Sequence, residues 1–331
     1  MPSRQCGVTT KHMISPQLST TSYIKKILIE DFNLDLNSPS GKTEINHLLN
    51  RTVLLGGKRL RPLLTLLFSR IASIDPKIAR VLAVSIEYVH AASLAHDDVI
   101  DGATMRRGKP SINVEGDNKM SILAGDYLLA QVINELASTG NIFIVKEMAA
   151  IIKRLSIGEW IQHDCLTARN YNDDSFHEIS LNKTSSVLEW CAVSPFLYSE
   201  AGSEIITICR RFGESLGICF QLYDDLLDYS DVSEKDCMLD LKNEQLTYLT
   251  YIYLRDNDLY KDYQAGVPLK KLVKISELSD AMNTVKNMAD EYHEKCIKLL
   301  NDLRIKVDLK ESNEDYKAIV FLLKKLKNRK K

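Results

Sequence analysis

Apolar residues recur with the helical period of about 3.6 along almost the whole chain, whereas strict alternation of apolar and polar residues is almost absent. This pattern predicts an all-α protein. The expected helices run roughly over residues 44–57, from 62 onward, from 76 to about 101, and over 118–138, 142–168, 175–189, 190–201 and 203–229, with a weaker group in 243–328. Residues 102–117 are expected to form a polar loop. Because no repeat, linker or change of composition divides the chain, we expect one domain.

Two acidic clusters with the pattern Asp-Asp-x-x-Asp lie inside otherwise apolar helical segments. Their members are Asp97, Asp98 and Asp101 in the first cluster and Asp224, Asp225 and Asp228 in the second. Residues four apart share a helix face, so the first and last aspartates of each cluster lie together. Carboxylates buried beside apolar side chains are unfavourable unless cations compensate them. Hard oxygen donors suit Mg²⁺, which also binds substrate phosphate, so the clusters predict one diphosphate held between two helices.

Cationic side chains are concentrated at two places that could bind a second phosphate group without metal. They are Lys58, Arg59 and Arg61 in the segment GGKRLRP, and Arg106, Arg107 and Lys109 in the loop after the first acidic cluster. Arginine binds phosphate through two parallel hydrogen bonds and lysine acts as a point charge. His90 lies on the same stripe as Asp97 and has two open interpretations, a phosphate ligand or a histidine satisfied in the core. Gln221, one turn before Asp225, could direct its carbonyl dipole toward developing positive charge.

The composition excludes several other classes of protein. With 43 basic and 44 acidic residues the formal net charge is −1, which argues against a nucleic-acid partner. The seven cysteines are odd in number and never in CxxC spacing, so neither a disulfide framework nor a zinc site is expected. No uninterrupted apolar run reaches the roughly 18 residues needed to cross a bilayer, so we expect no transmembrane segment. Cytoplasmic location is expected, with a mitochondrial alternative because residues 1–29 lack acidic residues and are rich in Ser and Thr.

The acidic and basic residues occur in motifs that resemble those of the all-trans polyprenyl diphosphate synthases. The motifs are GGKRLRP (56–62), YVHAASLAHDDVIDGATMRRGKPS (88–111), AGDYLLA (124–130), Lys183-Thr184 and GICFQLYDDLLDY (217–229), in the family's order. The resemblance covers about residues 40–250. It implies an all-α, single-domain bundle of isoprenoid-synthase type around a deep central cavity, usually as a homodimer. The chain would then consist of a disordered segment over 1–20 and a catalytic domain over 21–331.

The resemblance also implies roles for individual residues. Three Mg²⁺ ions would bind an allylic diphosphate through Asp97, Asp101 and Asp224, with the other three aspartates as further ligands or supporting groups. The remaining implied contacts are Arg106, Lys183 and Lys235 with the allylic diphosphate, and Lys58, Arg61, His90 and Arg107 with isopentenyl diphosphate. The allylic substrate would be geranyl, farnesyl or geranylgeranyl diphosphate. Departure of its diphosphate would leave an allylic cation, stabilised by Gln221 and the Lys183-Thr184 backbone, which the alkene of isopentenyl diphosphate attacks.

Product length should depend on the residues beneath the first acidic cluster. Ala92, five residues before Asp97, lies about 7.5 Å deeper along the helix. Short-chain members of the family place an aromatic residue at this position or the next, whereas Ala92 and Ser93 are small. Tyr88 lies one turn deeper, where long-chain members often carry an aromatic residue. We therefore expect products longer than farnesyl, with a geranylgeranyl diphosphate synthase as the alternative.

A departure from the family pattern leaves another function open. Gln245 stands where the family usually has Lys, which removes one cationic contact and would weaken substrate binding; it also suggests a catalytically weak subunit of a heteromeric synthase. The basic tail LKKLKNRKK could be a solvated end or a lid over the isopentenyl diphosphate site.

A terpene cyclase would use a similar acidic metal site but would not need Lys58, Arg61 and Arg107. Bisphosphonates, which mimic allylic diphosphate in this family, are plausible inhibitors.

Overall fold

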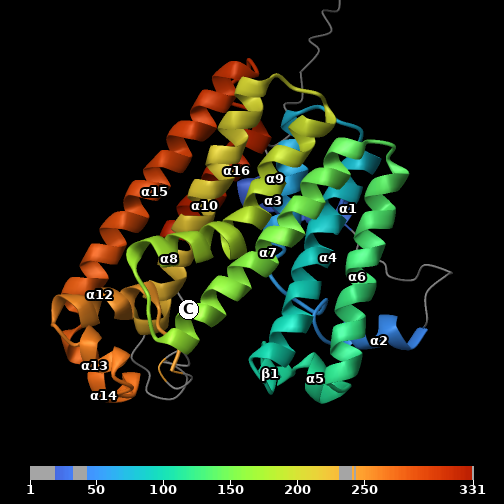
Figure 1. Cartoon of the computed structure of the whole chain (residues 1–331). Helices are drawn as coiled ribbons and strands as arrows, with labels where there is room; N and C mark the ends of the chain where they lie inside the picture. The colour runs from blue at the N-terminus through green and yellow to red at the C-terminus, as the bar shows by residue number, and fades with distance from the viewer. Residues whose placement is uncertain (1–18, 33–42, 231–240, 242–243, 330–331) are drawn as a thin grey trace, which may run out of the picture.

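The computed structural model of the chain describes residues 19–32, 43–230, 241 and 244–329, and this part is almost entirely helical (Figure 1). The first half contains α1 (Thr20–Glu30), α2 (Thr43–Arg51), α3 (Leu60–Ile71), α4 (Pro76–Ile100), α5 (Ile112–Glu115), α6 (Asn118–Ser138) and α7 (Ile142–Ala168). The second half contains α8 (Asp173–Ile179), a π-helix η1 (Ser180–Ser185), α9 (Ser186–Tyr198), α10 (Ser203–Ser230), α12 (Tyr248–Asp256), α13 (Tyr260–Gln264), α14 (Leu269–Leu272), a 3₁₀ turn η2 (Ile275–Glu277), α15 (Ser279–Lys306) and α16 (Glu314–Lys327).

The all-α prediction is confirmed, and several boundaries follow directly from local sequence. The side chain of Asp75 caps α4 by accepting from the backbone N–H of Lys77 at 2.7 Å, and Pro76 occupies the first turn, where its missing N–H costs nothing. The bounds of α6 and α7 agree with the predicted ranges 118–138 and 142–168. The domain division stays a prediction, although Thr20 already belongs to α1.

Other boundaries were wrong. The predicted break between 189 and 190 does not exist, because the chain is helical without interruption from α8 through η1 into α9. The helix expected over 44–57 ends at Arg51, and α3 begins at Leu60 rather than after Pro62. The expected loop over 102–117 contains α5 and a short antiparallel hairpin, formed by β1 (Met105–Arg106) and β2 (Lys109–Pro110).

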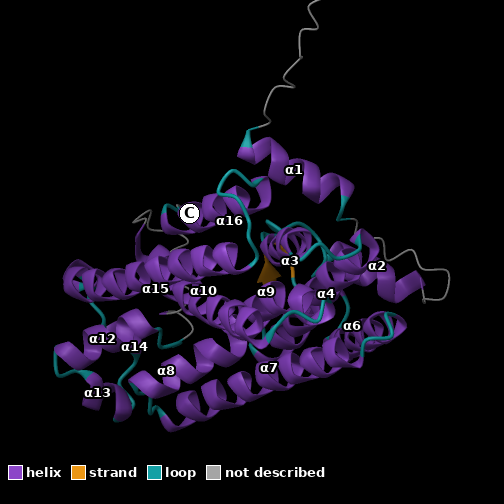
Figure 2. Cartoon of the chain, turned by 90° about the horizontal axis from the view of Figure 1, so that it is seen from above, coloured by secondary structure: helices purple, strands orange, loops and turns teal. Residues whose placement is uncertain are grey.

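The core of the bundle is built around α9, which lies in its middle (Figure 2). Every residue from 185 to 196 is buried, and α9 packs against α10, α3 and α7. Trp190 is fully buried and donates from Nε1 to the carbonyl of Leu82 on α4 at 3.2 Å. The helix α4 is long and apolar enough to cross a membrane by composition alone, but 61% of its most apolar window is buried inside the protein, as in a core helix.

Glycines allow three helices to approach one another unusually closely near the functional site. A Cβ atom on Gly217 of α10 would lie 2.2 Å from Cα of Ser185, and one on Gly213 would lie 2.2 Å from Cα of Glu189. A Cβ atom on Gly158 of α7 would lie 2.6 Å from Cγ of Lys183. These contacts fix η1 between α7 and α10, so its side chains meet those of both helices.

Candidate active site

A cationic cavity of about 640 Å³ brings together the four residues predicted to hold isopentenyl diphosphate. These are Lys58, Arg61, His90 and Arg107. The Nε atom of Arg61 is buried without a hydrogen-bond partner, and burial lowers the pKa of this guanidinium. An unpaired buried donor of this kind is typical of a site that receives an anion. Burial and the nearby arginines hold the pKa of His90 well below its ordinary value, so its imidazole is a neutral hydrogen-bonding group.

The loop that carries Lys58 is held in place by a buried ion pair. Arg59, whose φ of 49° is left-handed, pairs with the buried carboxylate of Glu87 on α4 and donates to the carbonyl of Leu54. Arg107 of the hairpin donates from Nη1 to the carbonyl of Leu55 at 2.8 Å. The two cationic segments are therefore tied to each other and to α4. Sequence reasoning missed Glu87, since a single Glu in an apolar helix gives no spacing signal.

The three aspartates of the first acidic cluster have different environments. Asp98 is fully buried and accepts from Nε and Nη2 of Arg106 at 2.8 and 2.5 Å, which holds the hairpin against α4. Asp97 is half-buried and Asp101 is exposed, and both interact electrostatically with Glu159 and Lys183. Burial raises the pKa of Asp97 to about 6, helped by Glu159 and opposed by Lys183. The contact of Arg106 with allylic diphosphate stays a prediction, and its guanidinium is engaged with Asp98.

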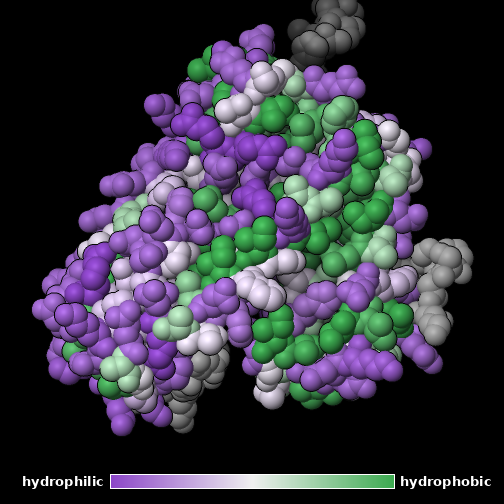
Figure 3. Space-filling view, viewed as in Figure 1, coloured by the Kyte–Doolittle hydropathy of each residue, from purple (hydrophilic) through white to green (hydrophobic). Residues whose placement is uncertain are grey.

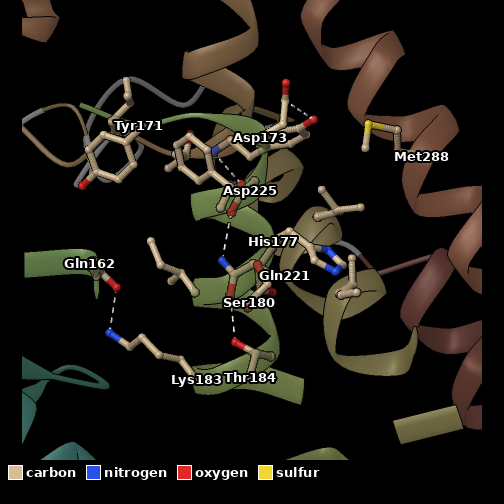
Figure 4. A pocket seen from close by; sticks show the side chains of 18 of the residues that line it. Gln162, Tyr171, Asp173, His177, Ser180, Lys183, Thr184, Gln221, Asp225 and Met288 are labelled. Atoms are coloured by element: carbon tan, nitrogen blue, oxygen red, sulfur yellow. Dashed lines mark hydrogen bonds between the residues drawn. The ribbon is translucent and has the colours of Figure 1, made fainter. Parts of the chain in front are cut away.

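The second acidic cluster lines another cavity, of about 540 Å³ (Figure 4). All three of its aspartates belong to this wall, together with Lys183, Thr184, Gln221 and Gln245. Thr184 donates from Oγ1 to Oε1 of Gln221 at 3.1 Å, and Nε2 of Gln221 donates to Oδ1 of Asp225 at 3.0 Å. The backbone N–H of Tyr248 donates to the other oxygen of Asp225 at 3.1 Å. Despite these bonds, burial raises the pKa of Asp225 to about 7.

Gln245 lies in the wall of the acidic cavity, so the substitution noted in the sequence falls at the diphosphate site itself. Lys235, the other cation predicted on this side, lies outside the described residues. Lys183 is thus the cation that the described part of the chain contributes to this wall. It donates to Oε1 of Gln162 at 2.8 Å and pairs with Glu159, two α7 residues that sequence reasoning did not single out.

Residues near the C-terminal end of α16 contact both cavities. Lys325, Asn328 and Arg329 line the cationic cavity, where Arg329 also lies over the ring of Phe220 with its Cζ atom 5.2 Å from the centroid. The same guanidinium donates from Nη1 to Oδ1 of Asp224 at 2.5 Å. The two last lysines of the basic tail lie outside the described residues.

The three predicted chain-length residues lie on α4 before the first cluster and differ in burial. Ala92 is fully buried and Tyr88 is nearly so, whereas Ser93 is partly exposed and donates to the carbonyl of His90 at 2.9 Å. None of the three appears in the wall of the cationic or the acidic cavity. Their role in product length stays a prediction.

The acidic residues suit a cation that is only partly held by protein. Among the described residues, no group of three Asp, Glu, His or Cys side chains is arranged to hold a metal ion by itself. Burial nevertheless raises the pKa of both Asp97 and Asp225, which marks carboxylates that lack sufficient positive charge around them. Mg²⁺ keeps several waters and takes one or two carboxylates plus substrate phosphate, so this donor set fits it.

The sequence matches the family model "Polyprenyl synthetase" over residues 42–288. The chain is 33% identical over 274 residues to a decaprenyl-diphosphate synthase from Dictyostelium discoideum, an alignment that covers 80% of this chain but 60% of that protein. It is 30% identical over 286 residues to a prenyl transferase from Cyanidium caldarium, covering 82% of this chain and 86% of that protein.

The fold is also similar to that of solved structures. A decaprenyl diphosphate synthase from Rhodobacter capsulatus superposes with a TM-score of 0.72 at 25% identity, covering 94% of this chain and 96% of that one. A polyprenyl synthase from Caulobacter crescentus, complexed with calcium and isoprenyl diphosphate, also gives 0.72 at 22% identity, covering 94% and 95%. The family match spans most of the sequence and includes both acidic clusters and the cationic loop, so this chain belongs to the polyprenyl synthetase family.

Proposed function

We propose that this protein is a trans-prenyltransferase that condenses isopentenyl diphosphate head to tail with an allylic diphosphate, making polyprenyl diphosphates longer than farnesyl. One observation carries the proposal: a cationic cavity with a buried, unpaired arginine nitrogen lies directly beside a carboxylate-lined cavity, joined through the contact of Arg329 with Asp224. Two anionic substrates can then be bound side by side by different chemistry. The cationic cavity takes isopentenyl diphosphate and the acidic cavity takes the metal-bound allylic diphosphate.

Bound Mg²⁺ would supply the positive charge that stabilises the departing diphosphate. Asp97, Asp101 and Asp224 would hold it, and we propose three ions per site. Among proteins of this fold, the Caulobacter polyprenyl synthase was solved with a divalent ion, calcium, and isoprenyl diphosphate. Lys183 adds a fixed cation beside the leaving group, which acts without reorganising during the reaction.

The other substrate, isopentenyl diphosphate, needs to be oriented rather than activated. Arg61 on α3 and Arg107 on the hairpin bind its diphosphate, and neutral His90 donates a hydrogen bond without adding charge. The Thr184–Gln221–Asp225 chain fixes the amide of Gln221 at the cavity wall. A polar group held in this way can stabilise a developing allylic cation, while the surrounding buried helices exclude water that would quench it.

The proposed product is of medium to long chain length. Relatives of this chain are named decaprenyl, octaprenyl and hexaprenyl synthases. The small residues Ala92 and Ser93 beneath the first cluster support the same assignment. A geranylgeranyl product is the alternative that sizing would reveal.

A second candidate is a catalytically weak subunit of a heteromeric synthase. The observation that favours it is the position of Gln245, in the wall of the diphosphate cavity where the family usually has a cation. Both acidic clusters are intact, which favours the active enzyme.

We also propose that the protein is a homodimer joined through α6 and α7. The outer face of these helices carries a broad apolar surface (Figure 3). Its exposed apolar residues are Met120, Ile122, Leu123 and Ile133 on α6, and Ile142, Phe143, Ile157, Trp160 and Leu166 on α7. Apolar patches of this extent are rare on monomers and mark interaction surfaces. Light scattering on the purified chain tests the assembly, and a monomer at micromolar concentration would contradict it.

For the compartment we propose the cytoplasm, with the mitochondrion as the alternative. One relative, from Yarrowia lipolytica, is named as a mitochondrial enzyme. Imaging of the full-length chain with a C-terminal fluorescent tag distinguishes the two.

The decisive experiment incubates the purified single chain with Mg²⁺, labelled isopentenyl diphosphate and geranyl, farnesyl or geranylgeranyl diphosphate, followed by sizing of the products. Label in a series of elongated products supports the synthase. Label absent from the product would indicate a cyclase, and an inactive single chain that a partner activates would indicate the subunit. Inhibition by a nitrogen-containing bisphosphonate would add support for the allylic site.

A further inference from the structure

Lys183 lies on the one π-helix in the described part of the chain. Such widened turns insert an extra residue into a helix and occur frequently at functional sites. The turn is secured from several sides: Nη2 of Arg154 donates to the carbonyl of Leu181 at 2.8 Å, and Oγ of Ser185 donates to the carbonyl of Glu214 at 3.0 Å. The backbone of Lys183 is therefore fixed, and only the direction of its long side chain is left to be set.

Two residues of α7 set that direction. Because Gly158 has no side chain, α7 approaches η1 closely, with Lys183 packed directly over the glycine. Glu159 and Gln162 follow on the same face of α7, three residues apart. Glu159 forms an ion pair with the ammonium, and Oε1 of Gln162 accepts from it at 2.8 Å, as Figure 4 shows for Gln162. Both partners are partly buried, with 25% of the Glu159 side chain exposed.

The alternative partners of Lys183 are the metal-binding carboxylates themselves. Its charge opposes the rise that burial causes in the pKa of Asp97 and Asp101, so the ammonium is close enough to interact with both carboxylates. An ammonium free to move would be attracted to these aspartates and would compete with a divalent ion for their oxygens. The pairing observed with Glu159 instead keeps the ammonium beside the cluster without occupying it.

We propose that Glu159 and Gln162 are positioning residues, which hold Lys183 away from Asp97 and Asp101 so that these carboxylates stay available to metal while the ammonium faces the diphosphate. The inference rests on the proposed function, because it assumes that the first acidic cluster binds a divalent ion. Neither residue needs to touch substrate for this role. Their effect passes through Lys183.

A double-mutant cycle on the intact chain tests the proposal, with Mn²⁺ alone as the probe and its dissociation constant measured by electron paramagnetic resonance. Glu159→Ala should weaken Mn²⁺ binding about fivefold, as expected for loss of one partly exposed ion pair. In the Lys183→Met background, where no ammonium can close onto the aspartates, Glu159→Ala should change Mn²⁺ binding by much less. Gln162→Ala should weaken binding in the same direction by a smaller factor.

Controls separate positioning from a simple charge effect and from misfolding. Equal effects of Glu159→Ala in both backgrounds would overturn the proposal, since Glu159 would then attract metal by its own charge; no effect in either would overturn it as well. Asp164→Ala removes an exposed carboxylate two residues beyond Gln162 and should leave Mn²⁺ binding unchanged. Glu159→Gln, which keeps the shape of the side chain, repeats the test if the alanine variant loses its thermal transition.

A kinetic readout completes the test. Glu159→Ala should raise the KM for allylic diphosphate and leave the KM for isopentenyl diphosphate unchanged, because Glu159 does not line the cationic cavity. An equal rise in both values would contradict the assignment. If the unmodified chain shows no prenyl transfer at all, the proposed function fails, whereas the Mn²⁺ cycle still decides the role of Glu159.

Discussion

Arg329 donates from Nη1 to Oδ1 of Asp224 at 2.5 Å, although the two residues belong to different cavities. A neighbouring contact reinforces the arrangement: Tyr223 donates to Oδ1 of Asp290 at 2.5 Å, and Nζ of Lys327 lies 3.2 Å from the same oxygen. Lys327 of α16 thus shares Asp290 of α15 with Tyr223, the residue before the second acidic cluster, while Arg329 contacts the first aspartate of that cluster. A divalent ion that binds Asp224 must compete with Arg329.

Replacing Arg329 by Ala should therefore have opposite effects on the two sites. Divalent metal should bind more tightly, by up to about fivefold, because one ion pair no longer competes for Asp224. The KM for isopentenyl diphosphate should rise, because the cationic cavity loses one of its guanidinium groups. Calorimetric titration with Mn²⁺ and steady-state kinetics measure the two effects.

The matched control is Lys324→Ala, which removes an exposed cation from the same helix outside the cavity wall. It should change neither quantity. Weaker metal binding in Arg329→Ala would show that the guanidinium supports Asp224 rather than competing with the ion.

Gly217→Ala should destabilise the protein and disturb the acidic cavity together. The added Cβ would lie 2.2 Å from Cα of Ser185, so α10 and η1 must separate. We expect the free energy of unfolding to fall by about 1–3 kcal/mol, as for an overpacked core. Activity should fall too, since the separation strains the bond from Thr184 to Gln221. Urea denaturation compared with Gly202→Ala, where nothing lies within 4 Å, measures the difference; equal stability of the two variants would contradict the prediction.

The features that could be read from sequence are those fixed by local chemistry. Asp75-Pro76 predicts a helix start because capping and the proline ring act within one turn. The convergence of Arg61, His90 and Arg107 in one cavity followed from the family motifs. The π-helix at 180–185 could not be predicted, because it depends on how closely Gly158 and Gly217 let α7 and α10 approach.

The different environments of the aspartates in the first acidic cluster could not be predicted from the sequence either. Asp97 and Asp98 are adjacent and chemically identical, yet one faces Lys183 and the other is buried against Arg106. Which aspartate meets the hairpin depends on the position of the hairpin relative to α4, a tertiary relationship. The same holds for Glu159, whose partner Lys183 comes from another helix.

The metal-free protein should lose stability as the pH rises from about 4 to about 7. Burial raises the pKa of Asp97 to about 6 and that of Asp225 to about 7, from an ordinary value of 3.8. Within this window the folded protein binds more protons than the unfolded chain, so the free energy of unfolding falls as these protons are released. In EDTA the thermal midpoint should thus be higher near pH 5 than near pH 8. Asp225→Asn should reduce this slope, and an unchanged slope would exclude Asp225 as its source.

Asp97→Ala should abolish prenyl transfer and leave the fold intact. Burial of this carboxylate is unfavourable, so removing it should not destabilise the metal-free protein. The loss of a metal ligand should lower kcat/KM at least about a hundredfold, since metal supplies several kcal/mol of charge stabilisation. Asp164→Ala is the control for an exposed aspartate. Full activity of Asp97→Ala would remove Asp97 from the metal site.

Ala92→Phe should shorten the product. Ala92 is fully buried five residues before Asp97, so an aromatic ring there would project into the packed region beneath the first acidic cluster, where we expect the growing chain to extend. The ring costs about 1–3 kcal/mol of stability by overpacking, and the thermal midpoint should fall accordingly. Ser93→Phe, at the partly exposed neighbouring position, should shorten the product with a smaller loss of stability. Chromatographic sizing of the labelled products gives the distribution of chain lengths. A folded Ala92→Phe variant with an unchanged distribution would remove Ala92 from the wall of the product tunnel.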